Sequence, residues 1–376
     1  LNPHKWPQVP VDCGALLTRH PEVHRAAYSL TPDYLTRLTF TMEDMAAIRH
    51  LGERAGRQQL FASQRPQELD ALRTSAIIES SESSNRIEGV VAAPGRVEAI
   101  VTRNDTPRDR SEQEIAGYRD VLQLIHESHE QMPLTANLLL QLHQRLFAYQ
   151  GHEGGRWKTV DNAIVERNAT GQVMRVRFRP TPAFQTADAM RAFEDSCRRL
   201  RGENVDPLVL TPLAVLDFLC IHPFLDGNGR IGRLLTLLML YQGGHSVGRF
   251  ISLERIVEES RNTYYEALER SSDRWHEGAH DALPWLRYFW GIMTKAYGRF
   301  EDRVGSRGGR GSKRERIRAA VGRQVAPFGI ADIAVECPDC SREMVRLVLR
   351  ELRDEGLLRA ESSGRGARWI KVAGGR

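Results

Sequence analysis

The sequence predicts a mainly α-helical protein with one β-hairpin and a separate basic module at its C-terminal end. Three observations lead to this fold class. Apolar residues recur every three or four positions through most of the chain, one segment alternates as strands do, and a glycine-rich stretch precedes the C-terminal segment. At 376 residues the chain is long enough for two or three domains.

The first helix with a clear start signal follows Thr41, a residue that favours helix N-caps. Apolar residues recur from Met42 to Leu51, and Glu43 and Asp44 occupy the first turn, where acidic side chains favour the helix dipole. Further helices are predicted over residues 69–86, 112–130, 134–149, 187–201, 211–221 and 281–302, and one begins near Arg230.

Residues 159–179 interrupt this helical pattern. The segments TVDNAIVE and VMRVRFR alternate on either side of RNATGQ, whose Asn and Gly tolerate a positive φ. A β-hairpin is therefore expected. The stretch VGSRGGRGS, with four glycines, predicts a flexible linker. Four regions follow: 1–105, 106–302, the linker 303–312, and the module 313–376.

Charge is unevenly distributed. The chain has 53 basic and 48 acidic residues, and residues 312–376 hold 14 and 9 of them, which leaves 39 of each (53 − 14 and 48 − 9) in the preceding part. The whole net charge of +5 therefore lies in the C-terminal segment. This asymmetry suggests an acidic partner, most simply nucleic acid, and the alternative is a solvated basic surface.

An odd number of cysteines in a chain of this size does not form a disulfide framework, so a reducing, cytoplasmic location is expected. The CPDC pair Cys337 and Cys340 lacks a second Cys or His pair at metal-finger distance, so zinc is not expected. The first residues lack a signal-peptide core, and the apolar run 234–240 is too short to span a bilayer, which predicts a soluble protein. The five cysteines are Cys13, Cys197, Cys220, Cys337 and Cys340.

The stretch HPFLDGNGRIGR, residues 222–233, carries the chemistry. Gly227 and Gly229 let the backbone adopt conformations closed to other residues, so successive N–H groups can point at one anion. The helix that begins near Arg230 adds its N-terminal dipole. Arg230 and Arg233 are spaced i, i+3 and share a helix face, where two guanidinium groups can hold a polyphosphate.

Two further residues of this stretch suit nucleotide chemistry. Asp226 offers a hard oxygen ligand for Mg²⁺ that bridges phosphates. His222 is the side chain in the stretch whose ordinary pKa suits a general base near neutrality. A lone His, a lone GxG or two arginines on a helix would each have a structural explanation, but their joint occurrence favours a nucleotide site.

HPFLDGNGRIGR resembles the signature of Fic-domain proteins, HxFx[D/E]GNGRxxR, without a departure. The resemblance covers roughly residues 70–300, with a looser match at the C-terminus. It implies a Fic-type helical bundle with a β-hairpin flap that holds the target segment by strand addition. It also implies a protein adenylyltransferase, which transfers AMP from ATP to a Ser, Thr or Tyr hydroxyl of a target protein, or of itself, and releases pyrophosphate.

The resemblance also implies roles for single residues. His222 would be the base that deprotonates the target hydroxyl, and Phe224 would anchor the loop. Doc-type toxins, which transfer phosphate, carry Lys at the position of Gly229, so this Gly favours nucleotidyl transfer. The remaining roles are Asp226 as the Mg²⁺ ligand, Gly227, Asn228 and Gly229 as the anion hole, Arg230 on the phosphates, Arg233 on the γ-phosphate, and Asn262, Tyr264 and Tyr265 at the nucleoside.

The sequence SNRIEG, which begins at Ser84, resembles the inhibitory pattern [S/T]xxxE[G/N] of the same family. Ser84 and Glu88 are spaced i, i+4 and share a face of the predicted helix, here taken to span about residues 69–88. If Glu88 pairs with Arg233, that guanidinium cannot receive the γ-phosphate. An alternative role for Glu88 is to orient water for the removal of AMP from the target.

The C-terminal module is expected to contain helices over residues 313–323 and 330–335, a longer helix from Arg342 with Ser341 as its cap, and two strands around a glycine-rich turn. This order resembles a winged helix-turn-helix. Arg342, Arg346, Arg350 and Arg353 form a stripe on the longer helix. Such a module binds DNA or docks proteins, including a second copy of the chain, and both alternatives remain open.

The leading hypothesis is thus a Mg²⁺- and ATP-dependent protein adenylyltransferase inhibited by its own Glu88. The main rival is a DNA-binding transcriptional regulator that uses the Fic core as a nucleotide sensor. The intact His222 argues against the rival, because nucleotide sensing needs no base.

Overall fold

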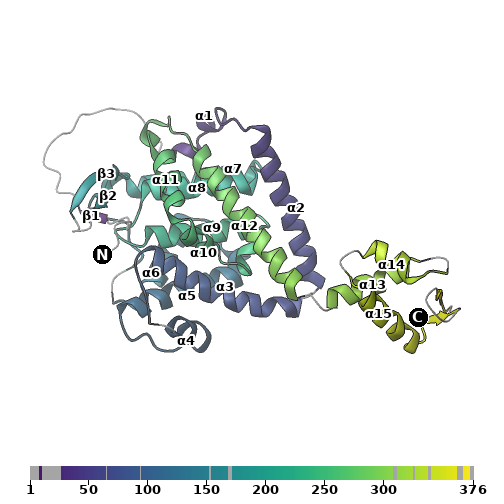
Figure 1. Cartoon of the computed structure of the whole chain (residues 1–376). Helices are drawn as coiled ribbons and strands as arrows, with labels where there is room; N and C mark the ends of the chain where they lie inside the picture. Colours follow the sequence, from purple (N-terminus) through teal and green to yellow (C-terminus); the bar gives the residue numbers. More distant parts are fainter. Residues whose placement is uncertain are drawn as a thin grey trace. The chain divides into compact units, whose positions relative to one another are not determined.

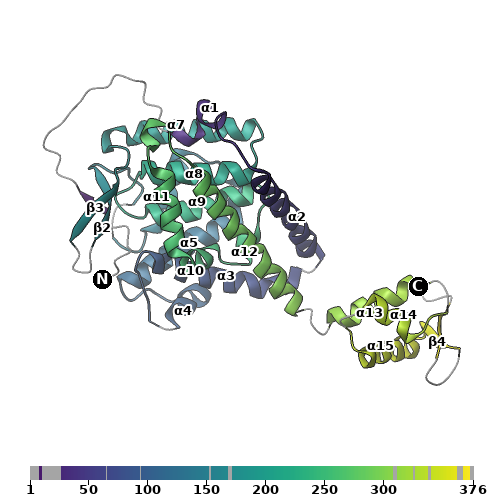
Figure 2. The same ribbon diagram turned by 45° about the horizontal axis from the view of Figure 1, so that its top comes forward.

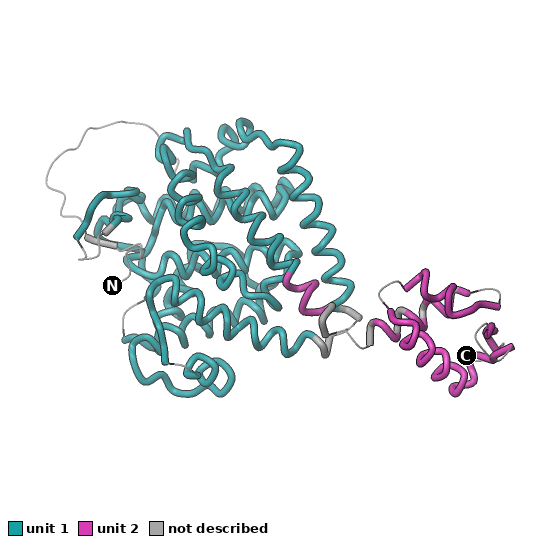
Figure 3. Tube along the Cα trace, viewed as in Figure 1, with its two compact units in different colours: residues 1–298 teal, residues 299–376 magenta. Residues whose placement is uncertain are grey.

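The computed structural model describes residues 8–10, 27–64, 66–93, 95–151, 154–167, 172–307, 311–324, 327–337, 340–361 and 367–372. It forms two compact units, residues 1–298 and 299–376 (Figure 3). The boundary lies within a long helix, α12 (Leu283–Arg307). No helix in the described ranges combines the length and the apolar character that a membrane crossing would need.

Unit 1 is mainly helical, as predicted, and Figures 1 and 2 show α8 and α9 near its centre. All of α8 after its first residue is buried, so this helix forms the middle of the core. The helices of unit 1 besides α12 are α1 (Pro32–Leu35), α2 (Met42–Gln64), α3 (Pro66–Ile87), α4 (Arg96–Arg103), α5 (Arg110–Ser128), α6 (Ala136–Leu146), α7 (Thr186–Gly202), α8 (Pro207–Ile221), α9 (Asn228–Gln242), α10 (Leu253–Glu259) and α11 (Arg261–Ser272).

Helix α8 begins a turn earlier than the sequence predicted, at Pro207 rather than Thr211. The Asp206 carboxylate caps it by accepting from the Leu208 amide at 2.8 Å. Pro212 then lies inside the helix and cannot donate to the carbonyl four residues earlier. The indole of Trp290 on α12 donates to that carbonyl, Leu208 O, at 2.8 Å, so tertiary packing satisfies the group that the proline leaves open.

The predicted start of α2 is confirmed, but polar contacts hold its first turn. Thr41 Oγ1 accepts from the Asp44 amide at 3.2 Å, and Asp44 Oδ2 accepts from the Thr41 amide at 3.0 Å. Both carboxylate oxygens of Asp44 also accept from Arg287 of α12 at 2.9 Å. Met42 and Met45 are mostly exposed, so the apolar face that the spacing predicted is buried only farther along the helix, at Leu51.

The predicted hairpin is present as β2 (Asn162–Arg167) and β3 (Val173–Phe178), which pair antiparallel. Its turn, residues 168–171, lies outside the described residues. A third strand that the sequence did not reveal, β1 (Gln8–Pro10), pairs with the other side of β2. The order β1-β2-β3 leaves β3 at an edge of the described sheet.

Other element ends differ from the predictions. Helix α6 ends at Leu146, three residues before the predicted end. Helix α12 continues to Arg307, through the first half of the predicted linker, because one glycine inside a helix costs only about 1 kcal/mol. Residues 308–310 lie outside the described residues, and Gly311 already begins the next helix.

Unit 2 consists of α13 (Gly311–Arg323), α14 (Ile330–Glu336), α15 (Arg342–Asp354) and the antiparallel strands β4 (Leu358–Ala360) and β5 (Trp369–Lys371). Ser341 caps α15, as predicted. The predicted apolar face of α15 is buried at Val345, Val348, Leu349 and Leu352. It packs in one core with residues of both other helices and both strands, and with Cys337 and Cys340 between α14 and α15. The hairpin turn, residues 362–366, lies outside the described residues.

Candidate active site

The stretch 222–233 connects α8 to α9. His222 ends α8 in the left-handed conformation, with φ of 52°. Gly227 precedes α9 with φ of 80°, and a Cβ there would lie 2.9 Å from the ring of Phe147, so both backbone and packing require glycine. As Gly227 has no side chain to cap α9, the first N–H groups of that helix are available to an anion.

Asn228 shapes the loop with its side chain. Its Oδ1 accepts from the Phe224 amide at 2.9 Å, and its Nδ2 donates to the Phe224 carbonyl at 2.7 Å. Asn162 of β2 donates to the same carbonyl at 3.1 Å, which ties the hairpin to the loop. Phe224 itself is fully buried. The side-chain amide of Asn228 is therefore occupied by the loop, and any contribution of this residue to an anion hole would come from its backbone.

His143 of α6 packs against the loop that follows His222. No sequence pattern indicated a role for this residue. Its ring stacks on Phe224 with centroids 3.8 Å apart. Nδ1 accepts from the Gly155 amide at 2.8 Å, so Nε2 carries the proton and donates to the Asp226 carbonyl at 3.1 Å. Burial lowers the pKa of His143 to about 4, which keeps the ring neutral.

His222 is held in the tautomer that a base requires. Its Nδ1 lies 3.1 Å from the Leu219 carbonyl, which only accepts, so Nδ1 carries the proton and Nε2 the lone pair. Burial, and next the charge of Lys158, lower the pKa of His222 to about 3. Lys158 is itself buried and donates to Asn162 Oδ1 at 3.0 Å and the Ile221 carbonyl at 3.1 Å. Its pKa is lowered to about 7 by burial.

Arg230 is almost completely buried and belongs to a charge cluster that the sequence did not show. It donates through Nη1 to Glu114 Oε2 of α5 at 2.7 Å, and its guanidinium lies 5.4 Å from the ring centroid of Phe147. Its Nη2 is 3.7 Å from Oδ2 of Asp226. The Asp226 side chain is 61% exposed, so it lies at the mouth of the site.

The predicted inhibitory helix is α3, and residues at its C-terminal end bind Arg233. It donates through Nη2 to Glu88 Oε1 at 2.9 Å and to the Ser84 carbonyl at 2.9 Å, and through Nε to Ser84 Oγ at 2.8 Å. A Cβ at Gly229 would lie 2.4 Å from Glu88 Oε1. The Glu88 carboxylate therefore covers the first turn of α9, where the anion would bind.

The three residues expected at the nucleoside lie in α11, and they differ in exposure. Tyr264 and Tyr265 are buried, and burial raises the pKa of both phenols, with the charge of Arg233 acting against the rise. Asn262 is exposed. The structure thus brings the two tyrosines close to Arg233 and does not bury Asn262 with them.

A buried carboxylate, Glu254 of α10, also joins this region and had no sequence signal. Its Oε1 accepts from Tyr118 of α5 at 2.8 Å, and its Oε2 accepts from Ser80 of α3 at 2.7 Å. It connects α3, α5 and α10 behind Arg233. Long-range pairing of this kind leaves no local pattern in a sequence.

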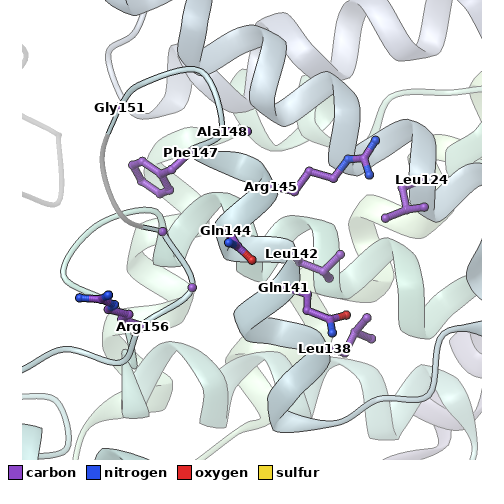
Figure 4. A pocket seen from close by; sticks show the side chains of 12 residues that line it. Leu124, Leu138, Gln141, Leu142, Gln144, Arg145, Phe147, Ala148, Gly151 and Arg156 are labelled. Carbon is purple, nitrogen blue, oxygen red and sulfur yellow. The ribbon is translucent and has the colours of Figure 1, made fainter.

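A separate cavity of about 820 Å³ lies along α6 (Figure 4). Leu138, Leu142 and Phe147 give it an apolar wall, and Arg145 and Arg156 are its cations. Phe147, whose ring lies beside Gly227, also lines this cavity. No residue of the stretch 222–233 lines it. The cavity therefore borders the site without forming part of it.

Known proteins match this chain over the region that contains the site. The model of the Fic/DOC family matches residues 133–240, which include the whole stretch 222–233. Residues 133–240 of this chain are therefore similar to a Fic/DOC domain. Protein adenylyltransferase Fic of Drosophila yakuba is 27% identical over 307 residues, which cover 73% of this chain and 57% of the relative. The protein of the same name from Nematostella vectensis is 24% identical, and the match covers 54% of this chain and 44% of the relative.

Solved Fic structures share the fold. A Fic family protein from Desulfovibrio desulfuricans G20 superposes with a TM-score of 0.58 and 20% identity over 90% of this chain and 98% of its own. A Fic domain containing signaling protein from Bacteroides thetaiotaomicron gives a TM-score of 0.56 at 20% identity, over 69% of this chain and 97% of its own. This chain spans little more than half the length of the curated Drosophila relative.

Proposed function

We propose that this protein transfers AMP from ATP to a hydroxyl side chain of a target protein. One observation carries the proposal: the end of α8 and the first turns of α9 bring together a neutral His222, the uncapped amides of α9, and the guanidinium groups of Arg230 and Arg233. Curated relatives that bear the name protein adenylyltransferase support the choice of reaction.

In the proposed reaction, the triphosphate binds against the N-terminus of α9, and Arg233 holds the γ-phosphate. His222 Nε2 takes the proton of the target hydroxyl, whose oxygen forms a bond to the α-phosphorus while the bond from that phosphorus to the pyrophosphate oxygen breaks. Pyrophosphate leaves, and the backbone amides of Asn228 and Gly229 stabilise the charge that develops on the phosphate oxygens.

The residues present fit a bound Mg²⁺. Asp226 offers an exposed carboxylate at the mouth of the site, and Mg²⁺ is commonly held by one or two carboxylates together with substrate phosphates. Within the described part of the chain, no group of three or more His, Cys, Asp or Glu side chains could hold a metal, so Asp226 would share the ion with the nucleotide. Magnesium would neutralise phosphate charge in the transition state.

We further propose that Glu88 inhibits the enzyme. Its carboxylate binds the guanidinium of Arg233, which the γ-phosphate would need, and lies over the first turn of α9. A hydrogen bond to a charged group contributes about 1.5–3 kcal/mol, enough to disfavour productive ATP binding and weak enough to be reversible. The same position would also let Glu88 orient a water for removal of AMP, and this alternative function remains a second proposal.

The target segment is proposed to add to β3, which is an edge strand of the described sheet, where main-chain groups can pair with an extended peptide. Unit 2 is proposed to recruit a further partner, DNA or protein, through α15. Within the described part of unit 2, Arg342, Arg346 and Arg350 are exposed and form no ion pair.

Incubation with Mg²⁺, ATP labelled on the α-phosphate and a cell lysate tests the function. Parent protein, Glu88→Gly and Glu88→Gly/His222→Ala are compared. We expect strong protein labelling with Glu88→Gly, weak labelling with the parent and none with the double variant. Equal labelling by parent and Glu88→Gly would contradict inhibition. ATP binding with no labelling by any variant would favour the nucleotide-sensing regulator.

A further inference from the structure

Helix α11 touches both the flap and the inhibitory helix. At its C-terminal half, Glu269 pairs with Arg175 and, at 3.4 Å, with Arg177, both on β3. At its first residue, Arg261 donates through Nη2 to the Ile87 carbonyl at 2.8 Å. Ile87 is the last residue of α3 and directly precedes Glu88. Figures 1 and 2 both show α11 beside the hairpin.

The Arg261 contact holds the end of α3 in a specific place. The last carbonyls of a helix have no partner inside the helix, so a cation there is stabilising. The guanidinium of Arg261 also lies 5.7 Å from the ring centroid of Tyr265, which fixes its direction. The adjoining helix α10 contributes a second contact, from Glu258 to Arg86 at 3.1 Å. Glu88 therefore reaches Arg233 from a helix end that α10 and α11 hold in position.

The other end of α11 borders an open groove of about 860 Å³. Residues 175–179 of the hairpin form one wall, and Glu269, Arg270 and Asp273 belong to the opposite wall. A peptide that adds to β3 would enter this groove. It would then meet Glu269 and the flap arginines, whose mutual ion pairs bridge the groove.

We propose that α11 couples target docking to release of the inhibitory glutamate. A target segment in the groove displaces Glu269 from Arg175 and Arg177 and shifts α11, Arg261 leaves the Ile87 carbonyl, and Glu88 leaves Arg233. By thermodynamic linkage, the factor by which target binding weakens the Glu88–Arg233 contact equals the factor by which loss of that contact raises the affinity for the target. Arg261 acts here as a positioning residue for Glu88. The inference rests on the proposed AMP transfer and adds a role for the target in activating it.

Two variants test this coupling, Arg261→Ala and Glu269→Gln. Because each removes a charge-assisted contact, we expect Arg261→Ala to raise AMP transfer about tenfold, and Glu269→Gln to raise it by a smaller factor. In the Glu88→Gly background Arg261→Ala should not change the rate, since the inhibitory contact is already absent. Matched controls are Arg198→Ala on α7, whose ion pairs lie within its own helix, and Glu266→Gln on α11, which is exposed.

Hydrogen exchange of the full chain gives a readout that does not depend on activity. The amides of Glu88, Gly89 and Val90 bond to carbonyls of Asn85 and Arg86. Both test variants should exchange these amides faster than the parent and both controls should not, at unchanged melting temperature.

Three results separate the possible failures. Unchanged transfer and unchanged exchange in Arg261→Ala, with Glu88→Gly active, would overturn the coupling alone. Lower transfer by Arg261→Ala in the Glu88→Gly background would overturn it in favour of a direct nucleotide contact. Inactive Glu88→Gly would refute the proposed function, and faster exchange in both test variants would still support the mechanical link.

Discussion

Gly229 and Glu88 share one small space at the residue scale. The absence of a side chain at Gly229 leaves room for the Glu88 carboxylate, since a Cβ would come within 2.4 Å of Oε1. The atom in the way is the far end of a flexible side chain, so the carboxylate can move aside, but it then leaves the position that binds Arg233. Any larger side chain at this position is likewise incompatible with the observed place of Glu88.

The effect of Gly229→Ala on the melting temperature should therefore differ in sign between the parent and the Glu88→Gly background. Alanine is favoured over glycine inside a helix by about 0.5–1 kcal/mol. In the parent we expect Gly229→Ala to lower the melting temperature, because the added methyl group would disturb the Glu88–Arg233 ion pair. In Glu88→Gly we expect an equal or higher one. Thermal unfolding of the four proteins measures this, and the same destabilisation in both backgrounds would contradict the packing argument.

Lys158 and His222 form a second residue-scale pair. Lys158 is positive below its pKa of about 7, and its charge helps to lower the pKa of His222 to about 3. A base with a lowered pKa is neutral, and able to accept a proton, above that pKa, and this ability disappears as the pH falls through it.

Replacing Lys158 with methionine should raise the pKa of His222, because the neighbouring charge is removed. In the Glu88→Gly background, the acid limb of kcat/KM should move to higher pH, while the rate above pH 7 changes less. The pH–rate profile of AMP transfer measures the shift. An unmoved acid limb, in a variant that melts like its parent, would show that Lys158 does not act on His222.

At the element scale, α15 separates its charges by face. Glu351 and Glu355 pair with Arg314 and Arg318 of α13. Arg342, Arg346 and Arg350 lie four residues apart on an exposed face, without an ion pair in the described part of the chain. Glu351 and Glu355 thus link this end of α15 to α13, and the three arginines contribute little to the stability of the module.

The variant Arg342→Ala/Arg346→Ala/Arg350→Ala should melt within a few degrees of the parent. If DNA is the partner, affinity for duplex DNA should fall, and the slope of log affinity against log salt should decrease by roughly 0.9 for each phosphate that the helix no longer neutralises. Fluorescence anisotropy at several salt concentrations measures both. Unchanged DNA affinity would leave protein docking as the role of α15.

The elements that carry the site differ in how well the sequence revealed them. Helix α7 was predicted within one residue at each end, and the starts of α2 and α15, which have strong caps, were also predicted. Helix α8 was misplaced at its start because a tertiary contact from Trp290 permits Pro212 inside it. The short helices α4 and α10, of eight and seven residues, were missed, and helices this short are marginal in isolation.

For the whole molecule, the division into two units separates the residues of the proposed reaction from the module that we propose recruits a partner. His222, Glu88 and the hairpin all lie in unit 1. Unit 2 has a core of its own, which includes Ile317, Phe328 and Leu349. Each unit therefore has its own basis for stability.

A chain of residues 1–307 that carries Glu88→Gly should keep AMP transfer to itself or to an added target within about twofold of the full-length variant. The reason is that every proposed site residue and the groove beside β3 belong to residues 84–284. Label transfer measured on both proteins tests the division. A large drop in transfer, with the truncated chain still folded by circular dichroism, would show that unit 2 contributes to the reaction.

The sequence by itself determined the residues of the loop 222–233, their order along the chain and the inhibitory pattern at Ser84 and Glu88. Those features are local: a helix end, two glycines and an i, i+3 spacing arrange neighbouring residues with little help from the rest of the chain. Only the tertiary structure decided their partners, which are Glu114 for Arg230, His143 for the Asp226 carbonyl and Arg261 for the end of α3. Such contacts join residues distant in sequence, and they form because burying a charge or a polar group without a partner is costly.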